Sequence, residues 1–249
     1  MAYKNWSPLW LLLALCPLLL LLGHQFPSPA LRTSPPATQA DVAQEVSEGP
    51  KLVALTFDDG PKPKTTPKLL DGLDQRGVKA TFFLIGKQVE EYPELVERMA
   101  ASGHQIGIHT YDHVILTGLN QTDFDAQVGR TRQILYDLLG YDDFLLRPPY
   151  GESDDAVKKY ADAPIILWSV DPEDWRDRNV QREVAHIVSH VQDGDLILLH
   201  DIYPESVDAA LQVIDQFHQA GYVFVTVEEL FAARGVTLEN GEVYRNCPP

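Results

Sequence analysis

The sequence is poor in cysteine, and this shortage limits the chemistry the protein can perform. Only two cysteines occur in 249 residues; Cys16 lies inside an N-terminal apolar run and Cys247 stands alone near the C-terminus. A disulfide framework is therefore excluded. A single remaining cysteine with no nucleophile-like surroundings also argues against thiol catalysis.

Basic residues are also scarce, because 20 Lys and Arg face 36 Asp and Glu. The first 40 residues contain two basic side chains, Lys4 and Arg32, and no acidic one, which leaves 18 basic against 36 acidic residues and a net charge of −18 beyond them. Such a surface repels nucleic acid and other polyanions, so we expect no nucleic-acid partner. A neutral, cationic or metallic partner fits this charge better. The alternative is that the acidic residues only keep the protein soluble and indicate no partner.

The chain lacks an apolar run of the usual transmembrane length. Leu9–Leu22 is apolar over 14 residues, whereas a bilayer crossing needs roughly 20. A short apolar core behind Lys4 is typical of a signal peptide. No clean cleavage site follows, which leaves an uncleaved membrane anchor open. We expect an extracytoplasmic protein, secreted or tethered through residues 9–22.

Composition divides the chain into four parts. Residues 1–30 are predicted to be the signal peptide or membrane anchor, and residues 31–50 a linker rich in Pro, Ser and Thr. Residues 51–235 are predicted to form the folded domain, and residues 236–249 a C-terminal tail. We expect this domain to be a monomer.

Short apolar strands alternate with helical patterns throughout the predicted domain. About seven strands are expected, within 52–57, 80–84, 105–110, 144–147, 165–169, 195–200 and 222–227. Helices are expected within 66–76, 88–101, 122–139, 153–160, 180–191 and 206–220. This alternation predicts an α/β fold with a mostly parallel sheet, either open and doubly wound or closed as a barrel. In both architectures ligands bind at the carboxyl ends of the strands.

The first strand ends in two adjacent carboxylates, Asp58 and Asp59, followed by Gly60-Pro61. Two neighbouring carboxylates repel each other. The pair makes chemical sense if one carboxylate binds a cation while the other stays free as a base. The alternative is an acidic turn that only solvates a loop.

The third strand leads into His109 and His113, which are four residues apart. On a helical turn two such imidazoles project to the same side and can share one metal ion. The spacing alone is weak evidence, because His186 and His190 repeat it inside a predicted surface helix. The strand before His109, together with the carboxylates of another strand end, favours the first pair.

Three further strand ends carry polar residues suited to hydrolysis. Arg147-Pro148-Pro149-Tyr150-Gly151 combines a possible carboxylate partner with a rigid backbone that can aim an N–H at a substrate oxygen. The segment 171–175 (DPEDW) can orient a histidine and supply an aromatic wall. His200 leaves an apolar strand, where it can protonate a leaving group.

The motifs at 56–61 (TFDDGP), 109–113 (HTYDH), 147–151 (RPPYG), 171–175 (DPEDW) and 198–201 (LLHD) together resemble those of the NodB-type polysaccharide deacetylases, carbohydrate esterase family four. Each string is weak or moderate alone, but their order and separations are specific. The resemblance spans about residues 51–231. It implies a distorted (β/α) barrel with fewer than eight parallel strands, which agrees with the strand count.

The resemblance also implies a metal triad of Asp59, His109 and His113. Two histidines and one carboxylate leave open positions for water and substrate. The cofactor implied is one divalent metal ion. Zinc suits these ligands best, and cobalt, nickel or iron are the alternatives.

Proton-transfer roles follow from the same resemblance. Asp58 corresponds to the general base, with Arg147 as its partner. His200 corresponds to the general acid, with Asp174 as the carboxylate that tunes it. None of these presumed catalytic residues is replaced in this chain.

Substrate contacts are implied for the Tyr150 backbone N–H at the oxyanion, and for Trp175 and Leu198 around the acetyl methyl group. The implied activity is removal of N-acetyl groups from an extracellular glycan polymer, with peptidoglycan N-acetylglucosamine or N-acetylmuramic acid as the first choice. Chitin oligosaccharides and exopolysaccharide are alternatives. A small-molecule amidase or esterase on the same scaffold and a non-catalytic glycan-binding protein are the competing functions.

Overall fold

A computed structural model describes residues 49–249. The expectations for the signal peptide or anchor and for nearly all of the linker lie outside the described residues. Within 49–249, no helix is both long enough and apolar enough to span a bilayer.

The described part is built on one parallel sheet in the order β6-β1-β2-β3-β4-β5-β8, with β7 paired to β1. The strands are β1 (Lys51–Asp58), β2 (Thr81–Leu84), β3 (Gln105–Ile108), β4 (Leu145–Leu146), β5 (Ile165–Ile166), β6 (Leu196–His200), β7 (Tyr222–Phe224) and β8 (Val243–Tyr244). Every ladder between these strands is parallel. The predicted α/β fold, a parallel sheet curled into an incomplete barrel, is therefore confirmed.

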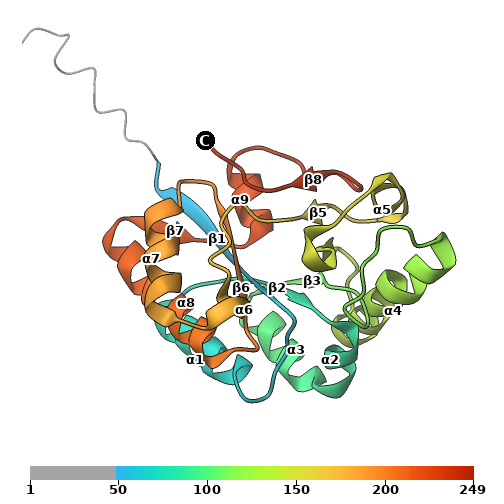
Figure 1. Cartoon of the computed structure of the whole chain (residues 1–249), viewed down its shortest axis with the longest axis horizontal. Coiled ribbons are helices and arrows are strands. Elements are labelled where there is room, and N and C mark those ends of the chain that lie inside the picture. The colour runs from blue at the N-terminus through green and yellow to red at the C-terminus, as the bar shows by residue number, and fades with distance from the viewer. Residues whose placement is uncertain (1–48) are drawn as a thin grey trace, which may run out of the picture. The chain divides into compact units, whose positions relative to one another are not determined.

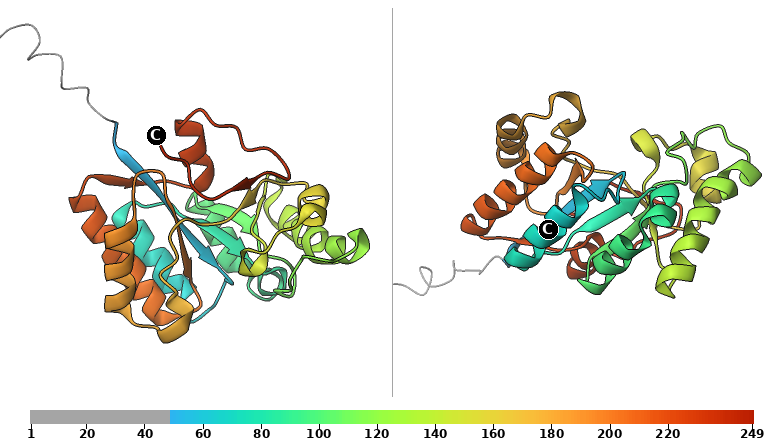
Figure 2. Two further views of the ribbon diagram at one scale, coloured as in Figure 1. Left: turned by 45° about the horizontal axis from the view of Figure 1, so that its top comes forward. Right: turned by 90° about the horizontal axis from the view of Figure 1, so that it is seen from below.

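Helices follow most of the strands. They are α1 (Thr66–Arg76), α2 (Gly86–Glu91), α3 (Pro93–Ala101), α4 (Gln121–Leu139), η1 (Pro149–Gly151), α5 (Asp155–Tyr160), α6 (Asp174–Asp177), α7 (Val180–His190), α8 (Pro204–Gln219) and α9 (Val227–Ala233). In Figure 1, helices α1, α3, α7 and α8 lie along one side of the sheet, whereas α9 lies on the other. Figure 2 shows the same separation after rotation.

Side-chain alternation along β1 creates two hydrophobic cores. Val53, Leu55 and Phe57 belong to the larger core, which includes apolar residues of α1, α3 and α8. Leu52 and Ala54 belong to the smaller core with residues of α9. Because successive side chains of a strand point to opposite faces, one buried strand serves both cores. The sheet is thus covered on both sides, as parallel sheets usually are.

The region predicted as one helix over residues 88–101 forms two helices instead. They meet at Tyr92, whose backbone is non-helical, with φ −134° and ψ 55°. Pro93 explains the break, because proline disfavours helical geometry at the residue before it and suits the first turn of a new helix. Residues after 235, described as a tail from sequence, contribute β8, which pairs in parallel with β5.

Candidate active site

The polar strand ends meet at one edge of the sheet because all its strands run the same way. Asp58 is the last residue of β1 and lies opposite His200, the last residue of β6, in their ladder. His109 follows β3 directly, and Arg147 follows β4 directly. Tertiary pairing thereby brings together residues that are up to 142 positions apart in the sequence.

Three potential metal ligands converge beside β1. The Asp59 Oδ1 atom lies 3.5 Å from His109 Nε2 and 3.3 Å from His113 Nε2. All three ligand atoms lie within 4.8 Å of one another, and no other group of three such side chains does so within residues 49–249. Asp59 Oδ1 is buried and has no hydrogen-bond partner among these residues.

Local contacts prepare His109 for a cation. Its Nδ1 lies 2.7 Å from the Arg147 carbonyl oxygen, so Nδ1 carries the proton and the Nε2 lone pair faces Asp59. Burial lowers the pKa of His109, which keeps the imidazole neutral, as a ligand must be. An acidic oxygen and two neutral imidazole nitrogens are a ligand set suited to a divalent transition metal. The residues present therefore fit such an ion.

The two histidines do not lie on the helical turn that their spacing suggested. Residues 109–113 are an irregular loop in which Thr110 and His113 have φ angles of 63° and 59°. Asp59 is likewise left-handed, with φ 74°. These backbone conformations are costly for non-glycine residues and tend to persist at functional sites. In contrast, His186 and His190 stack on α7 at 4.2 Å without a third ligand among the described residues.

Arg147 holds Asp58 from inside the barrel. Its Nη1 donates to Asp58 Oδ1 at 2.8 Å and to Thr56 Oγ1 at 2.7 Å, while Nε and Nη2 donate to carbonyl oxygens of β5 and Leu167. The contact to the carboxylate involves a single guanidinium nitrogen, Nη1. Arg147 is fully buried, and its guanidinium lies 4.1 Å from the Phe83 ring. Burial lowers the pKa of Arg147, whereas Asp58 raises it.

His200 is held by Asp174, the first residue of α6. Asp174 Oδ1 lies 2.7 Å from His200 Nδ1, and Oδ2 accepts the His200 backbone N–H at 2.8 Å. Burial by itself lowers the pKa of His200, but the hydrogen bond and charge of Asp174, with Asp58 and Asp59, raise it to about 9. His200 is therefore protonated at neutral pH, with Nε2 left to face the cavity.

A cavity of about 460 Å³ joins these groups. It is lined by Asp58, Asp59, His109, His113, Tyr150, Trp168, Asp171, Trp175, Leu198, His200 and Tyr203. Eight of the ten residues selected from sequence are in this lining; Arg147 and Asp174 lie behind it and contact Asp58 and His200. Three lining residues, Trp168, Asp171 and Tyr203, were not among those selected. Asp171 belongs to the motif at 171–175, and the position of Tyr203 three residues after His200 was a usable signal.

A buried carboxyl supports the loop after β1. Asp201 is fully buried, accepts a hydrogen bond from Thr66 of α1, and lies against the backbone of Gly60. Burial raises the pKa of Asp201 to about 7. Thr66 also accepts the Lys62 backbone N–H at 2.7 Å. The end of β6 is therefore connected to the loop that carries the candidate metal ligand Asp59.

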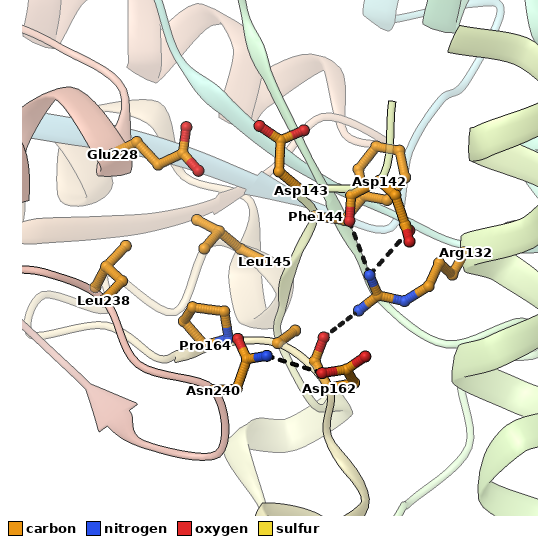
Figure 3. Close-up of a pocket in the computed structure, with 11 residues that line it drawn as sticks. Arg132, Asp142, Asp143, Phe144, Leu145, Asp162, Pro164, Glu228, Leu238 and Asn240 are labelled. Atoms are coloured by element: carbon orange, nitrogen blue, oxygen red, sulfur yellow. Dashed lines mark hydrogen bonds and ion pairs between the residues drawn. The ribbon is translucent and has the colours of Figure 1, made fainter. Parts of the chain in front are cut away.

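A second cavity, of about 350 Å³, lies near the opposite ends of β4 and β5 (Figure 3). On one side of it, Arg132 donates to the Asp142 side chain at 3.0 Å and to the Asp162 carbonyl oxygen at 2.6 Å. Asn240 donates to the Asp162 carboxylate at 2.8 Å. This cavity contains no converging set of three metal ligands. Among the described residues, the candidate metal ligands therefore lie at the carboxyl edge and not in this cavity.

Residues 45–164 match the sequence profile of the family described as polysaccharide deacetylase. The chain is 41% identical to the peptidoglycan-N-acetylmuramic acid deacetylase PdaC of Bacillus subtilis over 187 residues, which are 75% of this chain and 40% of that protein. It is 36% identical to a peptidoglycan-N-acetylglucosamine deacetylase of Bacillus cereus over 197 residues, 76% of this chain and 92% of that one. The chain therefore spans about two fifths of PdaC but nearly all of the shorter relative.

Solved structures give the same relationship. The structure of PdaC from Bacillus subtilis aligns with a TM-score of 0.73 and 41% identity, covering 75% of this chain and 93% of that one. A family 4 acetyl xylan esterase from Clostridium thermocellum, in complex with a cobalt ion, aligns with a TM-score of 0.76 and 32% identity. That alignment covers 80% of this chain and all of the esterase chain.

Proposed function

The chain belongs to the polysaccharide deacetylase family, and on that premise we propose that it is a metal-dependent hydrolase that removes N-acetyl groups from peptidoglycan. One observation carries the proposal. The cavity combines a three-ligand metal group with a carboxylate held by Arg147 and a protonated histidine held by Asp174. Metal-assisted amide hydrolysis uses three such components: a Lewis acid, a general base and a proton donor.

Asp59, His109 and His113 are proposed to hold one divalent ion, with zinc as the best fit to the ligands. When bound, the ion supplies Lewis acidity at the acetamide carbonyl and makes water easier to deprotonate. The three residues themselves hold the ligand atoms in one place. The Arg147 carbonyl oxygen keeps His109 in the tautomer whose Nε2 is free to bind the ion.

Asp58 is proposed as the general base. Arg147 donates to its Oδ1 atom at 2.8 Å, which leaves Oδ2 to accept a proton from the attacking water. The water oxygen forms the new bond to the acetyl carbon.

His200 is proposed as the general acid. Its Nδ1 proton is held by Asp174, so the proton transferred to the departing nitrogen comes from Nε2. Its pKa of about 9 keeps this proton in place at neutral pH. The carbon–nitrogen bond then breaks, and the products are acetate and a free amino sugar.

The remaining residues shape the acyl pocket. Leu198 is buried at the cavity wall and Trp175 is half exposed beside it, so both are proposed to contact the acetyl methyl group. Tyr150 has a left-handed backbone, with φ 62°, and its N–H is proposed to donate to the developing oxyanion.

The location is proposed to be extracytoplasmic, with the protein secreted or tethered through residues 9–22. The names of several relatives as peptidoglycan deacetylases support this, because peptidoglycan lies outside the cytoplasmic membrane.

Acetate release by the purified, zinc-loaded protein tests the function. Peptidoglycan strands, chitin oligomers, acetylated xylan and a small N-acetyl amide are compared, each with and without a chelator. We expect chelator-sensitive release that is fastest from peptidoglycan. Release fastest from xylan would indicate an esterase, as the structural likeness to the acetyl xylan esterase allows. No release from any substrate by metal-loaded protein contradicts the proposal.

A further inference from the structure

An exposed arginine lies at the margin of the catalytic cavity. Arg178 ends α6 with a left-handed backbone, φ 52°. Its guanidinium carbon lies 4.3 Å from the centre of the Tyr203 ring. Tyr203 itself lines the cavity, and its ring centre is 6.1 Å from that of His200. One aromatic ring therefore separates this cation from the proposed general acid.

Neighbouring carboxylates do not neutralise Arg178. Glu173 pairs with Arg176 at 2.6 Å, and Asp177 pairs with Arg182 at 2.7 Å. Within residues 49–249, every arginine other than Arg178 and Arg245 has a carboxylate partner within 4.0 Å. Arg245 is not stacked on a ring of the cavity. Arg178 is thus the exposed arginine that has both a free charge and a fixed position at the cavity.

The chain as a whole is acidic, so an arginine beside the cavity that has no carboxylate partner among the described residues stands out. The net charge of −16 disfavours polyanions in general. The unpaired charge of Arg178 over Tyr203, however, favours a substrate that presents a carboxylate at this margin.

We propose that Arg178 is a specificity-determining residue that binds a carboxylate of the glycan next to the reacting sugar. The enzyme then prefers a carboxylate-bearing amino-sugar strand to a neutral one. The planar guanidinium suits this role because it can stack on Tyr203 with one face and donate to a carboxylate with its edge. This inference rests on the proposed function and specifies the substrate class for the same cavity.

Peptidoglycan offers this carboxylate in two ways. The lactyl group of muramic acid is a free carboxylate where the stem peptide has been removed, and the stem peptide carries its own carboxylates where it is present. Chitin oligomers have the same N-acetylglucosamine units without either group. Comparing the three substrates therefore separates the contribution of the carboxylate from that of the N-acetylglucosamine unit.

The test compares wild-type protein with Arg178→Gln on intact peptidoglycan strands, peptide-stripped strands and chitin oligomers of similar length. We expect kcat/KM to fall roughly tenfold on at least one peptidoglycan substrate, and to change less than about twofold on chitin. A loss confined to stripped strands identifies the lactyl carboxylate, and a loss confined to intact strands identifies the peptide carboxylates. Arg178→Lys should keep part of the preference, more so at low salt.

Arg176→Gln is the matched control, because Arg176 is an exposed neighbour that is already paired with Glu173. The inference is overturned if Arg176→Gln lowers kcat/KM as much as Arg178→Gln does. It is also overturned if Arg178→Gln lowers kcat/KM equally on all three substrates, or on none of them. Each of these outcomes leaves deacetylation intact. Absence of acetate from every substrate refutes the proposed function instead. Calorimetric titration of stripped strands into Asp58→Asn protein, with and without Arg178→Gln, tests the contact independently of turnover; equal affinities would overturn it.

Discussion

Glu183 of α7 shows how one side chain can oppose the stability of this fold. It is fully buried, and neither carboxylate oxygen has a hydrogen-bond partner among the described residues. Burial, with the charge of Asp174 as the next cause, raises the pKa of Glu183 to about 7; Asp177 and Glu205 also raise it, and Arg182 lowers it. The folded state therefore holds this proton more tightly than the unfolded chain does.

Glu183→Gln should stabilise the protein at alkaline pH. Stability that depends on the Glu183 proton is present below pH 4.5 and is lost as the pH rises through about 7. Since one pKa unit corresponds to about 1.4 kcal/mol, we expect a gain of roughly 3 kcal/mol at pH 8 and little gain at pH 4. Urea unfolding across pH measures it. Glu97→Gln, at an exposed position of α3, should leave the dependence of the unfolding free energy on pH unchanged. A Glu183→Gln curve that runs parallel to the wild-type curve would contradict the argument.

His200→Gln should slow acetate release by roughly 10²- to 10⁴-fold, the usual contribution of a general acid. The glutamine keeps a polar group near Asp174 but has no proton of suitable pKa to transfer. Steady-state rates on peptidoglycan strands, with substrate binding measured separately, provide the measurement. His186→Gln, on the outer helix α7, serves as the control and should retain the wild-type rate. A His200→Gln rate within threefold of wild type would remove His200 from the mechanism.

At the scale of elements, the loop between β1 and α1 depends on close packing against the end of β6. A Cβ atom built at Gly60 overlaps the carboxylate of Asp201. That carboxylate has no room to retreat, because it is fully buried and bound by Thr66. Only glycine therefore fits between Asp59 and Pro61.

Gly60→Ala should weaken zinc binding and destabilise the protein by roughly 1–3 kcal/mol, because overpacking displaces the loop that carries Asp59. Zinc titration and thermal unfolding measure the two effects. Gly129→Ala is the control: its Cβ meets only Asp125 at 3.6 Å within α4, and alanine favours a helix by about 1 kcal/mol. Wild-type zinc affinity in Gly60→Ala would contradict the prediction, because it would show that the loop accommodates the added methyl group without displacing Asp59.

At the scale of the whole molecule, the metal group joins the ends of two strands. Asp59 follows β1, whereas His109 and His113 follow β3, and β2 lies between them. An ion bound to all three connects these segments in the folded state only. Binding should therefore appear as stability of the entire domain.

Zinc should raise the unfolding temperature, and a chelator should reverse the rise. Saturation at 100 times the dissociation constant stabilises by about 2.7 kcal/mol. His109→Gln should abolish the dependence on zinc, whereas His190→Gln, from the outer histidine pair on α7, should preserve it. Calorimetry with and without zinc is the measurement. Equal zinc stabilisation of His109→Gln would place the ion elsewhere.

The sequence by itself determined the parallel α/β fold and selected the residues that line the carboxyl edge. Both follow from local information: apolar strands are visible in the periodicity, and Asp58, His109 and His200 stand directly at strand ends. In a parallel sheet those ends must meet, so the polar residues at them were expected to converge. The substrate contacts of Tyr150, Trp175 and Leu198 were implied by the family resemblance. The roles of these residues stay predictions until the substitutions are measured.

Only the tertiary structure decided how those residues are held. The tautomer of His109 depends on the carbonyl oxygen of Arg147, 38 residues away, and Gly60 depends on the buried Asp201. The histidines approach through left-handed residues at 110 and 113 rather than through a helical turn. Likewise, Arg178 reaches the cavity only by lying over Tyr203. Such contacts join segments distant in sequence, and packing of the whole chain sets their geometry.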